Sequence, residues 1–169
     1  MTDYAKLLLG KDIRSIAKSN DVAVSIHDQV SFDALFSLLW HHERILVMRV
    51  ADAIEKITLV HREFLIPHKS QLLSLLKSAV NKELKWHLAL LVSRLPLNEE
   101  ELKVVWSVLS YWVQNPNESK IVRVNSLQGL HDLGIQFPML KEKYEEMVRR
   151  VAHEPIPSLQ ARIKKLRKP

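Results

Sequence analysis

An arginine and a carboxylate at helical spacing stand out first, in the stretch VMRVADAIEKI at residues 47–57. Asp52 lies between two alanines, where a carboxylate can be partly buried, and Arg49 lies three positions before it on the same helix face. Such a carboxylate is either one half of an intrahelical ion pair or a group that takes part in acid–base chemistry. The residues themselves leave both interpretations open.

Histidine is the second residue type that could carry chemistry, with 8 in the chain. His41, His42 and Glu43 form the densest group, but adjacent helical residues point about 100° apart, and no H-E-x-x-H pair brings two ligands to one face. The pairs at 27–28 and 131–132 lack the additional His and Asp that the helical His-Asp phosphohydrolases need. We therefore predict no metal site, and exposed turn positions for His41 and His42.

Motifs for phosphate binding and nucleophilic catalysis are absent from the sequence. The 3 glycines are too scattered to form a P-loop, a G-x-G-x-x-G loop or a G-x-S-x-G elbow. With no cysteine, disulfides, thiolate metal sites and thiol nucleophiles are excluded. We predict a protein that is not an enzyme and that needs no cofactor.

The elements that position these residues are predicted to be helices. In NEEELKVVWSVLSYWVQ, residues 98–114, apolar side chains recur at intervals of three and four and form one stripe. Asn98 and Glu101 make a capping box, which predicts the start of this helix. No segment has the roughly 18 continuous apolar residues of a membrane span, and no secretory signal is recognised. We expect an all-α, cytoplasmic protein.

The helices are organised by an internal repeat. One set of segments aligns without gaps, with a serine in the same column of the first three copies: LFSLLW at 35–40, LLSLLK at 72–77, VWSVLS at 105–110 and, more faintly, YEEMVR at 144–149. A polar turn follows each copy, and a second helical segment comes next. These second segments align at an offset of 38 residues: 47–57, 85–95 and 123–133. The unit is thus a helical hairpin.

The repeat resembles the HEAT repeat family. VMRVADAIEKI and IVRVNSLQGLHDL (121–133) are similar to its second-helix pattern of Val, Arg, small residues and Leu, although the second copy has Trp86 and His87 near the expected arginine. The resemblance covers about residues 31–167 and implies a right-handed α-solenoid of about four hairpins. We predict a single domain over residues 1–169, with hairpins at 31–61, 68–95, 98–134 and 138–167 and an N-terminal helical cap at 1–30.

In HEAT-like proteins the second helices line the concave surface, so the resemblance also implies a binding face. The polar second-helix positions predicted to form it are Arg49, Asp52, Lys56, Lys85, His87, Arg94, Arg123, His131, Arg162 and Lys165. An arginine early in a second HEAT helix often pairs with an acid in the preceding turn. This pattern predicts that Arg49 pairs with Glu43 and that Arg123 pairs with Glu118.

The charge of the chain bears on its partner. Lys and Arg number 25 against 19 for Asp and Glu, which gives a net charge of +6 and a pI of about 9.6. The C-terminal segment ARIKKLRKP supplies much of this excess. We interpret that segment as a solvated basic end, with a polyanion site as the alternative.

The resemblance favours a binding module for a protein partner, with no membrane contact. Nucleic-acid binding through a basic concave face and the basic C-terminal tail is the alternative. A third hypothesis compares the chain with the bacterial alkylpurine DNA glycosylases, which are HEAT-like and use aromatic, Asp and Arg groups on a basic concave face. The chain has 4 tryptophans, but Trp106 and Trp112 belong to the apolar stripe of residues 98–114 and are assigned to the core.

Overall fold

The computed structural model describes residues 2–9 and 17–167, and this part of the chain consists of helices and the turns that join them. The prediction of an all-α protein is confirmed. The chain divides into two compact units, residues 1–68 and 69–169, which are described separately below. In the described residues, no helix combines the length and apolar character needed to cross a membrane.

The first unit is built around one amphipathic helix, α4. Around α4 pack α1, α2 and α3, and the 3₁₀ helix η1 contacts it too. The bounds are α1 Tyr4–Leu9, α2 Ala17–Ser25, α3 Gln29–Phe36, η1 Ser37–Trp40, α4 Arg44–Ile57 and η2 Arg62–His68. The buried face of α4 includes Leu46, Val50 and Ile54, at the spacing of four that places side chains on one stripe. The segment assigned to an N-terminal cap thus holds two helices in its described part, and both contact α4.

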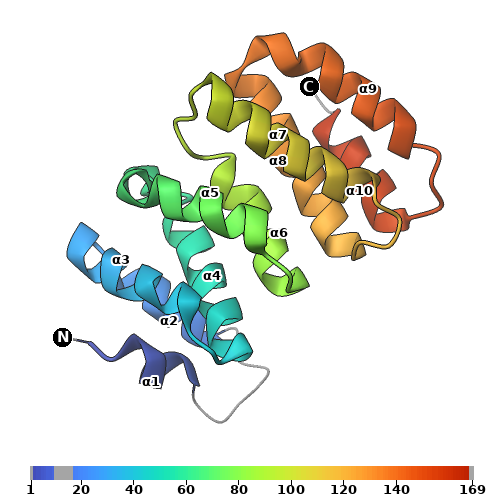
Figure 1. The fold of residues 1–169 in the computed structure, drawn as a ribbon. Helices are drawn as coiled ribbons and strands as arrows, with labels where there is room; N and C mark the ends of the chain where they lie inside the picture. The colour runs from blue at the N-terminus through green and yellow to red at the C-terminus, as the bar shows by residue number, and fades with distance from the viewer. Residues whose placement is uncertain (1, 10–16, 168–169) are drawn as a thin grey trace. The chain divides into compact units, whose positions relative to one another are not determined.

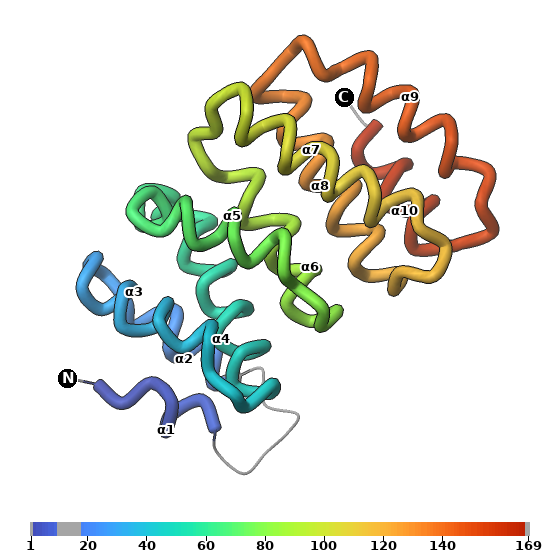
Figure 2. Tube along the Cα trace, in the orientation of Figure 1, coloured from blue at the N-terminus to red at the C-terminus, as the bar shows by residue number. Residues whose placement is uncertain are grey.

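The second unit is a set of helices joined by short turns (Figure 1). The bounds are α5 Lys69–Ser78, α6 Lys82–Val92, α7 Glu99–Gln114, α8 Lys120–Gln136, η3 Pro138–Leu140, α9 Lys141–Val151 and α10 Pro157–Leu166. Within it, α7 contacts α5 and α9, while α8 contacts α6 and α10. Figure 2 follows the same chain trace, with α7 and α8 side by side and connected by a short turn. Alternate helices of the second unit therefore pack on one another, which places α8 among α6, α7 and α10.

Capping side chains define where the two longest helices begin. Before α7, the Asn98 side chain accepts a hydrogen bond from Glu101 N at 2.9 Å, and the Glu101 carboxylate accepts one from Asn98 N at 2.8 Å. This is the predicted capping box, and it is confirmed. Before α8, the Ser119 side chain accepts from Val122 N at 3.4 Å. Each cap satisfies backbone N–H groups that have no partner inside the helix.

The tryptophans follow the predicted stripe only in part. Trp112 is buried, whereas Trp106 is half-buried and Trp40 is exposed. The stripe that carries Trp112 includes Leu102, Val105, Leu109 and Val113, all of which are buried on α7. Trp112 is therefore a core residue, as assigned.

Ser126 on α8 is a buried residue whose hydroxyl makes no hydrogen bond within the described chain. A buried hydroxyl without a partner loses its hydrogen bonds to water and forms none in the protein, which lowers the free energy of unfolding. We expect Ser126→Ala to leave stability unchanged or to raise it by up to about 1 kcal/mol, measured by urea unfolding. Ser119→Ala removes the N-cap of the same helix and should lower the free energy of unfolding by about 1 kcal/mol. A loss of stability in Ser126→Ala equal to that in Ser119→Ala would contradict this account.

Candidate functional site

The described structure places the predicted binding residues in two groups, one in each unit. In the first unit, the Asp52 carboxylate accepts hydrogen bonds from the Lys56 ammonium and from the Ser19 hydroxyl, and Lys56 also donates to Ser19 Oγ at 3.2 Å. Lys56 lies four residues after Asp52, so the two form an intrahelical ion pair on α4. Ser19 comes from α2, in the segment that does not align with the repeat. The cluster thus ties α2 to α4.

This cluster does not have the geometry of a catalytic site. Ser19 is 1% exposed, and its hydroxyl donates to a carboxylate instead of facing an open space. A serine nucleophile has to reach its substrate and needs an adjacent base that is free to take the proton. Asp52 is half of an intrahelical pair, but its partner is Lys56 in place of the Arg49 that the sequence indicated.

Arg49 is buried in the first unit and donates to the backbone carbonyl of Leu8 in α1. His87 and Arg123 are buried as well. A buried side chain cannot contribute to an accessible binding surface, so these three residues are removed from the predicted face. The physical reason is that each lies on the core side of its helix, where the Arg49 and Arg123 guanidinium groups donate to neighbouring elements.

The second unit shows how Lys85 and Arg123 are used. The Lys85 ammonium lies 2.6 Å from the Glu118 carboxylate and 5.5 Å from the centre of the Trp112 ring, which is a cation–π distance. The Arg123 guanidinium donates to Val113 O at 2.7 Å and to the Glu154 carboxylate at 2.7 Å. The predicted pair between Arg123 and Glu118 is therefore wrong, because Glu118 takes Lys85 and Arg123 takes Glu154.

These two ion pairs follow one rule. Each joins a cation near the start of α6 or α8 to an acid between the next two helices of the chain, 33 and 31 residues further on. The offset of 38 residues already places Lys85 and Arg123 in one column of the repeat. A search of that column against the following turns, instead of the preceding ones, would have found both partners.

The exposed and half-buried members of the second group lie on α6, α8 and α10, except Arg94, which lies in the turn after α6. Arg162 on α10 donates to the Gln128 side chain at 2.8 Å, and Gln128 in turn donates to Asp132 at 2.8 Å. His131 lies beside Asp132, with Nδ1 and Oδ1 3.3 Å apart. Lys165 is exposed, and Arg94 is half-buried. The Gln128 side chain was missed by sequence reasoning because it is neither charged nor part of a motif, and Asp132 was considered only as part of a His-Asp catalytic pair.

Tyr144 of α9 borders this group. Its ring stands edge-on to His131, with the ring centres 5.4 Å apart. Burial raises the pKa of Tyr144 to about 12, and the nearby Glu145 carboxylate adds to the effect. Tyr144 therefore stays protonated at neutral pH and acts here as a packing residue.

Of the two histidines predicted at exposed turn positions, His42 is exposed and His41 is half-buried. His41 and His42 occupy the turn before α4, and their rings stack with centres 4.2 Å apart. His41 Nδ1 accepts a hydrogen bond from Glu43 N at 3.0 Å, so this ring nitrogen has a structural partner. Among the described residues, no group of three or more His, Asp or Glu side chains could hold a metal ion.

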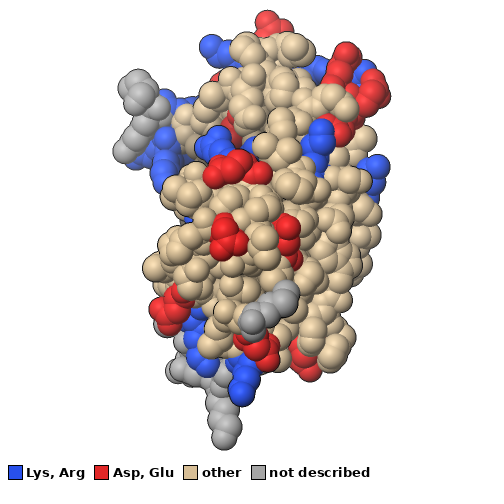
Figure 3. All heavy atoms as spheres, turned by 90° about the vertical axis from the view of Figure 1, so that its left-hand side faces the viewer, with Lys and Arg blue, Asp and Glu red and all other residues tan. Residues whose placement is uncertain are grey.

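The charge on the surface is mixed. On the face drawn in Figure 3, Lys and Arg side chains lie in separate groups, with acidic and many uncharged side chains between them. Asp132 also interrupts the basic positions of α8 and α10.

No match is found among protein-family models, curated proteins or solved structures. Inferences about function therefore rest on the residues and their geometry.

Proposed function

We propose that the protein is a non-catalytic binding module of the HEAT type, a right-handed α-solenoid of four hairpins with an N-terminal cap. The sequence repeat supports this proposal, and so does the packing of alternate helices in the second unit. The regular pairing of a second-helix cation with the acid of the next turn also supports it. HEAT repeats serve mainly as interaction scaffolds, so the functional part of the proposal is an inference from fold.

The observation that carries the proposal is the bonding between successive second helices. Asn125 of α8 donates to Trp86 O of α6 at 3.3 Å, and Gln136 of α8 donates to Ser93 O at 2.5 Å. Arg162 extends the connection from α10 to α8. Side chains held in this way lose little further conformational freedom on binding, which is what favours a preorganised recognition surface.

We propose a protein as the partner. The second-helix surface combines half-buried groups of both signs, His131, Asp132 and Arg162, with the exposed Lys165. Mixed charge and amide groups suit the varied surface of a protein, where electrostatic complementarity fixes the orientation of the partner. Nucleic acid is the second candidate, because α10 carries exposed Lys164 and Lys165 and contains no acidic residue.

Site-directed photo-cross-linking tests this proposal. A benzoylphenylalanine at position 165 reports on the second-helix surface, and one at position 111, an exposed tyrosine of α7, reports on the first-helix surface. With extract from the source organism, we expect a discrete protein adduct from position 165 and none from position 111. Equal adducts from both positions, or none from either, would count against the proposal.

Nuclease treatment and salt dependence distinguish a nucleic-acid partner from a protein partner. If the adduct at position 165 disappears on nuclease treatment, nucleic acid is the partner. Binding to a polyanion should also weaken by orders of magnitude between about 50 and 200 mM salt. A protein contact of mixed polarity should change far less.

A further inference from the structure

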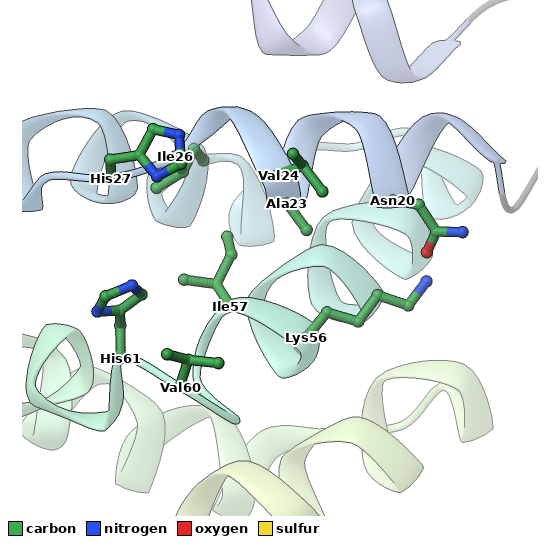
Figure 4. A pocket seen from close by; sticks show the side chains of 9 residues that line it. All are labelled: Asn20, Ala23, Val24, Ile26, His27, Lys56, Ile57, Val60 and His61. Carbon is green, nitrogen blue, oxygen red and sulfur yellow. The ribbon is translucent and has the colours of Figure 1, made fainter.

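The first unit contains a groove that lies outside the second-helix surface of the second unit. It runs between α2 and the end of α4 and has a volume of about 450 Å³ (Figure 4). Ile26 and Ile57 contribute buried side chains to it. Val24 and Val60 also line it, although they are 73% and 76% exposed. Two large aliphatic side chains left in solvent at one groove form an apolar surface that a partner can cover.

The polar residues of the groove lie at its two ends. In Figure 4 the Lys56 side chain extends toward Asn20 at one end, and His27 and His61 lie at the other. No Asp or Glu is among the residues that line this groove. The lining therefore offers N–H donors and one permanent cation, a composition that complements carboxylates.

The position of Lys56 is fixed by the cluster with Asp52 and Ser19. Asp52 and Ser19 take two of the three N–H groups of the ammonium, so one remains to face a ligand. Asp52 reduces the net charge at this end of the groove, and the lysine acts there as an oriented donor. At the other end, His61 Nδ1–H donates to the Glu63 carboxylate at 3.0 Å, so Nε2 of the neutral ring is an acceptor, and the donors for a carboxylate lie at the Lys56 end.

Because the groove is open to solvent, it suits a helix of a partner better than a small molecule. Sites for small molecules enclose most of the ligand surface, commonly 70–90%. This groove is open to solvent between two neighbouring helices, a form that accepts a third helix laid along them. Apolar side chains at i and i+4 of such a helix would cover Val24 and Val60.

We propose that the groove between α2 and α4 binds an amphipathic helix from a protein partner, with an apolar stripe and an acidic residue near the end that meets Lys56. This site goes beyond the proposed second-helix surface and does not depend on it. The occupant is recognised by burial of its apolar stripe in the groove and by the N–H donors of Lys56 and Asn20 at one end.

A displayed library of helical peptides of about 15 residues, randomised on one face, tests the proposal against the whole chain. We expect selection to enrich apolar residues at i, i+4 and i+7 together with Asp or Glu. The enriched peptide, synthesised with a fluorescent label, should bind Val60→Asp and Val24→Asp at least about tenfold more weakly than the native protein in fluorescence anisotropy.

Val30→Asp is the matched control, because Val30 is 74% exposed in the same unit and does not line the groove. It should bind the peptide as the native protein does, and all three variants should show native circular dichroism. Lys56→Gln should weaken binding of the acidic peptide. It should not change binding of a second peptide in which Gln replaces the acidic residues. Failure to enrich any helix, enrichment of basic helices, or equal binding by Val60→Asp and Val30→Asp would overturn the proposal.

Discussion

Replacement of Gly129 by alanine is expected to destabilise the second unit by about 2–3 kcal/mol. Gly129 lies in α8, where the helix crosses α6 and α7. A Cβ atom at this position would press against the backbone oxygen of Ala89, far inside van der Waals contact, and would lie 3.0 Å from Leu109 Cδ1. The nearest obstacle is backbone, which cannot turn aside as a side chain can, so α6 and α8 would have to separate.

The same helix supplies the control. Gly134 is also in α8, and a Cβ there would meet only Tyr144 Cβ, at 3.9 Å. Because alanine is the better helix former, Gly134→Ala should raise stability by about 0.5–1 kcal/mol. The two substitutions are chemically identical and are expected to have opposite signs.

Urea unfolding followed by tryptophan fluorescence measures both variants. A Trp40→Phe background removes the only tryptophan of residues 1–68, so that the signal comes from the second unit alone. The midpoint should fall for Gly129→Ala and rise for Gly134→Ala. If Gly129→Ala also raised the midpoint, the close approach of α8 to α6 would be wrong.

Local features of the fold could be predicted because their causes are close together in sequence. The capping box at Asn98 and Glu101 spans three residues, and the apolar stripe of α7 repeats every three or four. By the offset of 38 residues, Gly129 shares a column with Ala53 and Leu91, and small or apolar residues at such a position are typical of close helix packing. The sequence does not show which neighbouring atom lies closest, because that depends on how α6 and α8 cross.

The partners of the charged residues could not be predicted in the same way. Asp52 bonds to Ser19, which is 33 residues away in a segment outside the repeat. Arg123 bonds to Glu154, beyond the whole of α9, although Glu118 is nearer in the chain. Glu118, in the turn before α8, is nearer in the chain, whereas the packing of α10 on α8 brings the turn before α10 closer in space. The burial of Arg49 and His87 was not predicted either, because a polar residue in an amphipathic pattern is assigned to the surface by default.

Arg123→Ala is expected to cost about 3–5 kcal/mol, the largest effect of any substitution considered. The side chain is 2% exposed, and its guanidinium donates both to Val113 O and to Glu154. Val113 is in the last turn of α7, where carbonyl groups have no partner within the helix. The substitution therefore leaves a buried carbonyl without a donor, a carboxylate without a cation and a cavity of the size of the lost side chain.

Three further variants separate these contributions. Arg150→Ala removes an arginine whose side chain is 59% exposed and pairs with Glu146 on the same helix, so it should change stability by no more than about 0.5 kcal/mol. Arg123→Met fills most of the cavity and should recover part of the loss, while Val113 O stays unbonded. Glu154→Gln keeps an acceptor for the guanidinium and should cost least of the substitutions at this pair. If Arg123→Ala cost no more than Arg150→Ala in urea unfolding, the guanidinium would not join α7, α8 and the turn before α10.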